Sequence, residues 1–221
     1  MNGKMEKKNF LQQFLSYLRL KVLQNEREKK IADILYKIIK NKKKISICDY
    51  GAGFNPDIIR FLAKKINYTR IHCYDFYNNK QLSLLNNNTL NIEFKKIESF
   101  KKTKKKYDIV IIIDVLHHIG IENKIIKKIL VNLKLKSKIL IIKDHFEDSY
   151  FSRLLIQFMD WIGNYKDNVK IPKKYYTKRK FKETLETCNF KNYRISQNHK
   201  IYSNKFLFFS QKKLHFIAIL K

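Results

Sequence analysis

The sequence predicts an α/β protein with a doubly wound, mostly parallel sheet that has helices on both faces. Short apolar runs with strand character alternate with segments whose apolar residues recur at helical spacing, as in successive βαβ units. Two of these runs, residues 108–114 and 138–143, consist largely of isoleucine, valine and leucine. Such runs are typical of central parallel strands that are buried on both faces.

The expected elements follow from this periodicity in chain order. Helices are expected at residues 10–23, 31–39, 58–66, 81–86 and 121–133, and within an aromatic region that extends to about residue 189. Strands are expected at residues 45–50, 70–75, 91–95, 108–114, 138–143, 207–209 and 214–220. Residues 101–106 are rich in lysine and are expected to form a solvated loop.

Length and composition indicate one globular domain in a cytoplasmic protein. The chain has 221 residues, of which 44% are hydrophobic, so it can bury a core of its own. The N-terminus lacks the apolar run of a signal peptide, and no apolar run is long enough to span a membrane. Cys48, Cys73 and Cys188 lie far apart, which predicts reduced thiols rather than a metal site or a disulfide framework.

The net charge of +29 admits two interpretations. A strongly basic surface suits nucleic acid or an anionic membrane. The basic residues are mostly lysines, however, and isoleucine and asparagine are also abundant. All three have AT-rich codons, so a coding bias would give the same composition. Readers of phosphates and bases tend to use arginine, whose planar fork binds in a bidentate manner.

The segment ISICDYGAGFNPDIIRFLAKK, residues 45–65, carries the first functional signal. A strand ends at Asp49 and two glycines follow, at the sheet edge where doubly wound folds bind their ligands. Gly51 and Gly53 permit positive φ and close approach of a ligand to the backbone. Asn55 replaces the third glycine of a dinucleotide fingerprint, and Asn55-Pro56 is a good helix start.

Two carboxylates narrow the ligand further. Asp49 would repel a pyrophosphate but suits a ligand with a positive group. Asp75 ends the next strand, at the position where an acid accepts hydrogen bonds from ribose hydroxyls. A nucleoside with a cationic amino-acid tail matches both, and S-adenosylmethionine is such a molecule. An NAD-dependent enzyme fits less well, because the third glycine is missing and Asp49 is present.

These segments resemble the class I S-adenosylmethionine-dependent methyltransferases. DYGAG at residues 49–53 matches the family pattern D-x-G-x-G, YDF at 74–76 follows the second strand, and YDIVIIIDVLHHI at 107–119 looks like the fourth. The resemblance covers residues 45–143 and, more weakly, the closing LHFIAIL. It implies a Rossmann-like sheet with an antiparallel C-terminal strand. Asn55 departs from the family, but asparagine tolerates the left-handed region.

The resemblance also implies roles for single residues. The loop of Asp49, Tyr50, Gly51, Ala52 and Gly53 would pass under the methionine moiety, with Asp49 toward its amino group. Asp75 would bind the ribose and Phe76 would lie against the adenine. Asp114 would edge the site, Glu98 would lie near the adenine amine, and His118 would order the cofactor or face the acceptor. Asp75 and Asp114 as turn residues, and His118 as a structural histidine, are the alternatives.

Asp144 and His145 follow the fifth strand and are candidates for a general base. Methyl transfer to oxygen or nitrogen often requires removal of a proton. Neighbouring residues on a strand point in opposite directions, so both need not reach one atom. No cluster of possible ligands has metal-binding spacing, which predicts activity without a metal. His117-His118 and Asp144-His145 could still meet in space.

Residues 146–176 are rich in aromatic side chains, which suits a lid over an apolar acceptor or a packed helix. Phe151, Leu154, Leu155, Phe158 and Ile162 share one face at helical spacing. No Asn-Pro-Pro-Tyr-type motif follows the fourth strand, which favours a small or lipid-like acceptor over nucleic acid. An RNA methyltransferase and a non-catalytic cofactor-binding relative stay as alternatives, and peripheral membrane contact stays open.

The expected organisation is one methyltransferase domain over residues 1–221. N-terminal helices would occupy residues 1–40 and the cofactor-binding core residues 45–143. The substrate lid would occupy residues 145–190 and the C-terminal strands residues 191–221.

Overall fold

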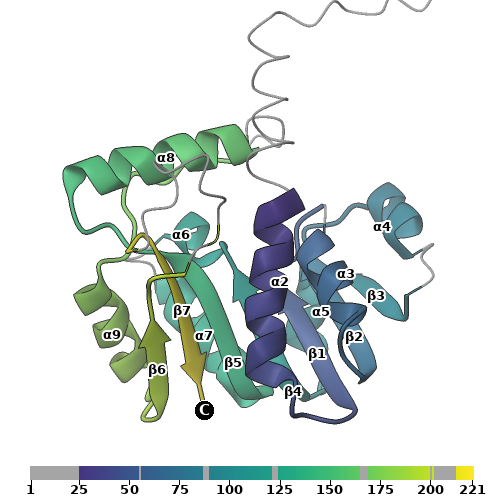
Figure 1. Ribbon diagram of the computed structural model, residues 1–221. Helices are drawn as coiled ribbons and strands as arrows, with labels where there is room; N and C mark the ends of the chain where they lie inside the picture. Colours follow the sequence, from purple (N-terminus) through teal and green to yellow (C-terminus); the bar gives the residue numbers. More distant parts are fainter. Residues whose placement is uncertain are drawn as a thin grey trace, which may run out of the picture.

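The computed structural model describes residues 25–54, 56–86, 90–120, 124–164, 169–199, 201 and 213–221. Seven described strands form one sheet in the order β3-β2-β1-β4-β5-β7-β6 (Figure 1). The strands are β1 (Ile45–Tyr50), β2 (Tyr68–Asp75), β3 (Ile92–Lys96), β4 (Tyr107–Ile113), β5 (Ser137–His145), β6 (Tyr193–Ser196) and β7 (His215–Leu220). β1 to β5 pair in parallel, and β7 is antiparallel to β5 and β6. The predicted fold class is therefore confirmed.

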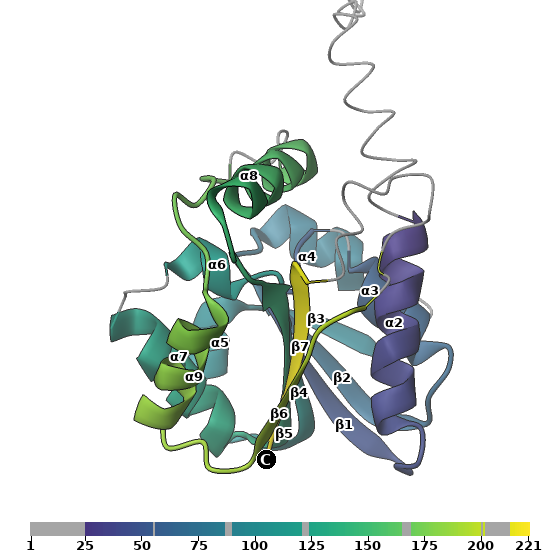
Figure 2. The same ribbon diagram turned by 60° about the vertical axis from the view of Figure 1, so that its left-hand side comes forward.

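Helices cover both faces of the sheet (Figure 2). The first cluster of buried side chains joins the sheet to α2 (Asn25–Ile39), α3 (Asp57–Ala63), α4 (Asn79–Asn86) and α8 (Tyr150–Asn164). The second joins the sheet to α5 (Ile97–Lys102), α6 (Leu116–Ile119), α7 (Lys124–Leu135) and α9 (Lys178–Thr187). β1 and β4 are adjacent although they are not consecutive, so the sheet reverses its winding between them. The carboxyl ends of β1 and β4 are where this class of fold opens a ligand crevice.

The expected elements match the described ones closely, apart from a few differences. The short strand β6 was not among the expected strands. Residues 97–102 form the short helix α5, which takes up the start of the expected loop because Ile97 and Phe100 bury one face. The four-residue helix α6 was not expected. β5 extends to His145, so Asp144 and His145 lie within the strand and pair with Phe216 and His215 of β7. Three expected features lie outside the described residues: the helix at 10–23, the strand at 207–209 and Asn55.

The apolar face expected in the aromatic region is divided in the structure. Leu155 and Ile162 of α8 are buried against the core, whereas Phe151, Leu154 and Phe158 are exposed. The helix therefore has an apolar side toward the protein and a second apolar side toward solvent. The spacing of these five residues in the sequence did not distinguish the two sides, because all five lie within one wide arc of the helix.

Two further findings concern the cysteines and the helices. The three cysteines are buried and form no disulfide with one another. Among the described residues, no helix has the length and apolar character that crossing a membrane requires.

Candidate active site

A cavity of about 730 Å³ lies at the carboxyl ends of β1, β2, β4 and β5. One side of it is formed by the loop that follows β1 and by the end of β2. The other side is formed by the segment after β4, by His145 and by the inner face of α8. Arg27 and Glu28 of α2 also line the cavity.

Glycine is required in the loop after β1 by both backbone conformation and space. Gly51 and Gly53 have φ values of +81° and +71°. A Cβ atom on Gly51 would also collide with the side chain of Val115, which follows β4. The amide of Gly51 donates a hydrogen bond to the carbonyl oxygen of Tyr74 over 2.8 Å. The loop is therefore held between the ends of β2 and β4.

Asp75 ties the same loop to the end of β2. Its carboxylate accepts hydrogen bonds of 2.6 Å from the backbone amides of Gly53 and Phe76. The hydroxyl of Tyr77 donates to the carbonyl oxygen of Gly53 over 2.8 Å. The Phe76 side chain is largely exposed at the edge of the cavity. Asp75 thus lies at the cavity wall with a preorganised carboxylate.

Asp49 is a buried carboxylate that no cationic side chain of the described residues contacts. Burial, and then the nearby charge of Asp75, raise the pKa of Asp49 to about 7. A ligand with a positively charged group would remove this penalty, because it would stabilise the ionised form. The loop at residues 49–53 and the two carboxylates therefore fit the cationic amino-acid part and the ribose of S-adenosylmethionine.

Asp114 is surrounded by cations, in contrast to Asp49. It follows β4 with a φ of 54° and is ion-paired with Arg27 of α2. The ammonium of Lys143, a fully buried residue of β5, lies 2.5 Å from its carboxylate. Burial alone would raise the pKa of Asp114, but Lys143 and Arg27 outweigh it and hold that pKa well below its ordinary value.

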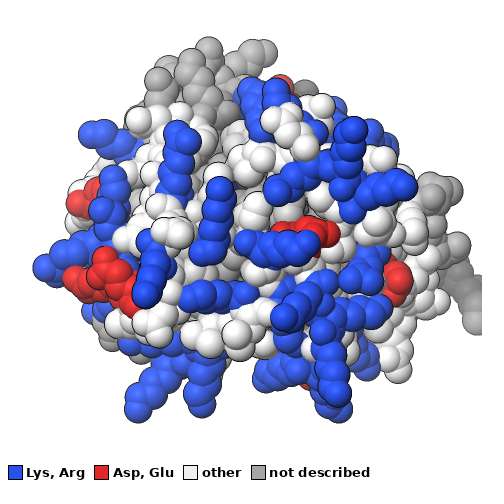
Figure 3. All heavy atoms as spheres, turned by 90° about the horizontal axis from the view of Figure 1, so that it is seen from below, with Lys and Arg blue, Asp and Glu red and all other residues white. Residues whose placement is uncertain are grey.

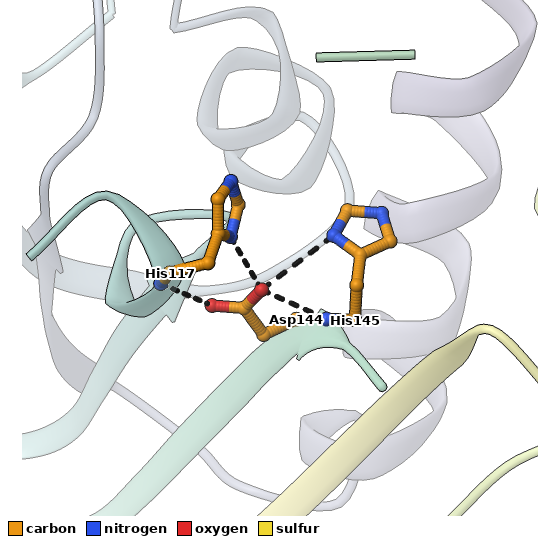
Figure 4. A group of neighbouring side chains, drawn as sticks. All are labelled: His117, Asp144 and His145. Atoms are coloured by element: carbon orange, nitrogen blue, oxygen red, sulfur yellow. Dashed lines mark hydrogen bonds and ion pairs between the residues drawn. The ribbon is translucent and has the colours of Figure 1, made fainter. Parts of the chain in front are cut away.

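Asp144 is completely buried, is not among the residues that line the cavity, and takes part in a hydrogen-bonded network (Figure 4). His117 Nδ1 lies 2.5 Å from one carboxylate oxygen of Asp144, and the backbone amide of His145 donates to the same oxygen over 2.8 Å. His117 Nε2 lies 3.4 Å from Asp160 of α8, and Asp160 accepts a 2.6 Å hydrogen bond from the Tyr175 hydroxyl. The network therefore joins α6, β5 and α8.

The electrostatics of this network favour a charged His117. Burial would lower the pKa of His117, but Asp144 and then Asp160 outweigh burial and raise it to about 10. His117, Asp144 and His145, or His117, His118 and Asp160, lie close enough together to hold a metal ion. His117 belongs to both groups and directs each ring nitrogen at a carboxylate, and an imidazolium has no lone pair for a metal. The predicted independence from metal stays a prediction.

His145 and His118 are the histidines that line the cavity. Among the described residues, neither ring nitrogen of His145 has a hydrogen-bond partner. Its Nδ1 lies 3.5 Å from both Asp114 and Asp144. Burial, and then the charge of Lys143, lower the pKa of His145. Burial, and then the charge of His117, lower that of His118 as well.

Most residues expected at the site line this one cavity. They are Asp49, Tyr50, Gly51, Ala52, Gly53, Asp75, Phe76, Asp114, His118 and His145. Glu98 is exposed on the first turn of α5, where its neighbour Ile97 lines the cavity instead. Sequence reasoning missed Arg27, Lys143 and Asp160. Of these three, only Asp160 could have been noticed in the sequence, because it is a single acidic residue within an apolar helical segment.

Comparison with known proteins agrees with this geometry. A family model described as a methyltransferase domain matches residues 23–195. The plantazolicin methyltransferase BpumL in complex with SAH has a TM-score of 0.59 and 17% identity, with 89% of this chain and 82% of that chain covered. No curated protein sequence matches the chain.

Two other solved structures have the same fold. A cyclopropane-fatty-acyl-phospholipid synthase-like protein from Lactobacillus casei has a TM-score of 0.59 and 10% identity, over 95% of this chain and 99% of that chain. A SAM-dependent methyltransferase from Aquifex aeolicus has a TM-score of 0.56 and 16% identity, over 94% and 96%. Because the family model covers most of the chain, the chain belongs to this methyltransferase family, and the class expected from the sequence, an S-adenosylmethionine-dependent methyltransferase, is confirmed.

Proposed function

We propose that the protein methylates an oxygen or nitrogen atom of a small, largely apolar or lipid-like acceptor. The observation that carries this proposal is the division of one cavity into two kinds of wall. Asp49 and Asp75 provide negative charge on one wall. The other wall carries the apolar side chains of Ile113, Val115, Ile119, Ile129, Met159 and Val169, beside Asp114, His118, His145 and Asp160.

The cofactor would be held by the loop 49–53 and the end of β2. Asp49 would face the amino group, and Asp75 would accept hydrogen bonds from the ribose. Phe76 would lie against the adenine, with Ile97 on the same side and Glu98 farther out. When bound, S-adenosylmethionine supplies an electrophilic methyl group on a sulfonium centre.

The protein's own residues would align the acceptor and exclude water. Apolar side chains of α8 and of the segment after β4 would surround the acceptor, and alignment of reacting groups supplies much of the rate in such transfers. Asp114 would hold its edge of the cavity in place through Arg27 and Lys143. His118 would face the acceptor or order the cofactor.

We assign removal of the acceptor's proton to His145, and a positioning role to Asp144. His145 lines the cavity, and its lowered pKa keeps the ring neutral and able to accept a proton near pH 7. Asp144 holds the backbone of His145 and the ring of His117. Loss of a general base commonly costs about 10²–10⁴ in rate, so His145→Ala should lower turnover on that scale and leave cofactor affinity unchanged.

RNA methylation has weaker support, because a large group of exposed lysines lies at the end of the molecule opposite the cavity (Figure 3). Figure 3 shows the end opposite the cavity, which is covered largely by lysine and arginine. Exposed lysines there come from residues 40–44, 64–65 and 101–106, which precede β1, β2 and β4. An RNA bound to these lysines would lie away from the cavity.

We also propose that the chain works as one methyltransferase domain over residues 1–221. N-terminal helices at 1–40 would flank a cofactor core at 45–143, followed by a substrate lid at 145–190 and C-terminal strands at 191–221.

The decisive experiment for the proposed acceptor uses S-adenosylmethionine labelled in its methyl group with fractionated cell extract. Label in a small or lipid-like product supports the proposal, and label in RNA alone contradicts it. Calorimetry with SAH tests cofactor binding separately.

A further inference from the structure

α8 presents a different chemistry on each of its two sides. Met159, Asp160, Gly163 and Asn164 line the cavity. The outer side exposes large apolar side chains at helical spacing, here called the α8 stripe: Tyr150, Phe151, Leu154, Phe158 and Trp161. Their exposed fractions run from 39% for Trp161 to 71% for Tyr150. Contiguous exposed apolar surface of this kind commonly marks an interaction site.

The stripe has no charged side chain within it. The charged residues of α8 are Arg153 and Asp160, and each is paired with another residue of the protein. Arg153 donates to the Glu147 carboxylate over 2.8 Å, and Asp160 is buried against His117 and Tyr175. A water-facing helix surface normally carries charged residues, so this surface is suited to an apolar environment.

Exposed lysines flank the stripe. Gln157 of α8 donates a 2.9 Å hydrogen bond to the carbonyl oxygen of Pro172, which keeps the following segment beside the helix. Lys170, Lys173 and Lys174 of that segment are exposed. Aromatic side chains next to lysines are typical of protein surfaces that lie in the headgroup region of anionic membranes.

We propose that the α8 stripe docks on an anionic lipid surface. Aromatic and leucine side chains would enter the acyl boundary while the neighbouring lysines contact anionic headgroups. The cavity opens on the other side of the same helix, so a lipid-like acceptor could pass from the surface to the site. That last step rests on the proposed function, whereas docking itself does not.

A lipid surface fits these residues better than the rival occupants do. Nucleic acid would be attracted to the lysines at the opposite end of the molecule (Figure 3). A second copy of the chain would bring its own lysines against those that flank the stripe, and like charges repel. The remaining rival is the segment that precedes Asn25 in this chain, and the experiment below distinguishes it.

Trp161 makes the proposal directly measurable, because it is the sole tryptophan of the chain. The full-length protein is titrated with phosphatidylcholine vesicles, with and without phosphatidylglycerol. With the anionic vesicles we expect the Trp161 emission to shift to the blue and to be quenched by brominated acyl chains. Added salt should weaken the response, because it screens the lysines.

Variants then test the stripe itself. Phe151→Ser combined with Leu154→Ser should weaken vesicle affinity by about tenfold or more, since two exposed apolar side chains are lost from the contact. The matched control is Leu84→Ser combined with Leu135→Ser. These residues are 70% and 67% exposed on α4 and α7, outside the stripe. The control pair should keep full affinity.

Three results would overturn the proposal. One is the absence of binding to anionic vesicles. Another is binding in a sedimentation assay with no change in Trp161 emission, which would indicate contact through the lysine-rich end or a stripe covered by the segment before Asn25. The third is an equal loss in the control pair. Calorimetry with SAH should give the same affinity for every variant, so failure of docking is distinguishable from failure of the proposed function.

Discussion

The two sides of the cavity differ in the partners of their carboxylates. On the wall formed by β1 and β2, here the cofactor half, Asp49 and Asp75 contact no cationic side chain of the described residues. On the side formed by β4, β5 and α8, together with the network behind it, here the network half, Asp114, Asp144 and Asp160 each have a cationic partner. Asp114 has Arg27 and Lys143, and Asp144 and Asp160 share His117.

The difference indicates which half of the cavity is suited to bind a positively charged ligand. Removing a carboxylate from water costs several kcal/mol unless an opposite charge is supplied. The network half supplies that charge from within the protein, so its carboxylates build a rigid frame. The cofactor half leaves the charge to be supplied, which suits a cationic cofactor. Accordingly, burial raises the pKa of Asp49 to about 7, whereas paired Asp114 keeps a pKa well below the ordinary value.

Removing His117 should produce the largest loss of stability, because two buried carboxylates would lose their shared cation. For His117→Gln we expect the free energy of unfolding to fall by about 3–5 kcal/mol. Urea denaturation followed by circular dichroism measures this. His118→Gln is the matched control, since His118 lines the cavity beside it and should cost less than about 1 kcal/mol. An equal loss of unfolding free energy in the two variants would contradict the role of His117 as the shared cation of Asp144 and Asp160.

The pH dependence of stability provides a second test of His117. Its folded-state pKa of about 10 lies above the ordinary value of 6.5. The stabilisation is therefore complete below about pH 6.5 and is lost as the pH rises toward 10. The wild-type protein should lose stability across this window, and His117→Gln should lose less. A parallel decline in both proteins would argue that His117 is neutral in the fold.

Asp49→Asn tests the cofactor half. A charged hydrogen-bonding group contributes about 1.5–3 kcal/mol, so SAH affinity should fall about 10- to 100-fold in calorimetry. Asp108→Asn is the control, because Asp108 is an aspartate at the opposite end of β4 and binds Lys138. Affinity that is unchanged in Asp49→Asn would contradict the assignment of the amino group to this carboxylate.

The raised pKa of Asp49 predicts the direction in which stability and SAH affinity change with pH. The folded state without cofactor holds a proton on Asp49 up to about pH 7, whereas the ordinary pKa is 3.8. Stability of this state should therefore fall as the pH rises from about 4 to 7, and Asp49→Asn should lack that fall. Wild-type SAH affinity should increase as the pH rises through 7, because the ionised carboxylate binds the amino group. The variant should show a flat profile.

The sequence predicted the cofactor half better than the network half, for a physical reason. Residues 49–53 and Asp75 act through local backbone geometry at strand ends, and such geometry leaves a pattern in the sequence. The ion pairs of Asp114 join residues from α2, β4 and β5, and only folding brings them together. Neither Arg27 nor Lys143 has a local signature.

The same distinction explains the details of the fold. The long apolar runs that became β4 and β5 were readily predicted because burial on both faces demands them. α5 and α6 have six and four residues, too few for periodicity to reveal. The alternation of Asp144 and His145 was expected, but which one faces the cavity depends on how β5 pairs with β7 and how α8 crosses it.

Gly51→Ala tests the contact between the two halves. Gly51 has a φ of +81°, and a Cβ atom would collide with Val115. We expect a loss of about 2–3 kcal/mol in the free energy of unfolding, from strain and overlap together. Gly120→Ala has a φ of +95° but open space around the Cβ, so strain alone should cost about 1 kcal/mol. Val115→Ala should partly rescue Gly51→Ala, and failure to do so would argue against the overlap.

Tyr77→Phe should have the smallest effect and sharpens the comparison within the cofactor half. The substitution removes one hydroxyl, which donates a 2.8 Å hydrogen bond to the carbonyl oxygen of Gly53. Because the ring stays buried, only this bond is lost, at a cost of about 1 kcal/mol. A looser loop should lower SAH affinity about two- to fivefold in calorimetry, while Tyr68→Phe at the other end of β2 should leave it unchanged. Loss of stability with unchanged SAH affinity would mean that Asp75 alone fixes the loop, since its carboxylate also binds the amide of Gly53.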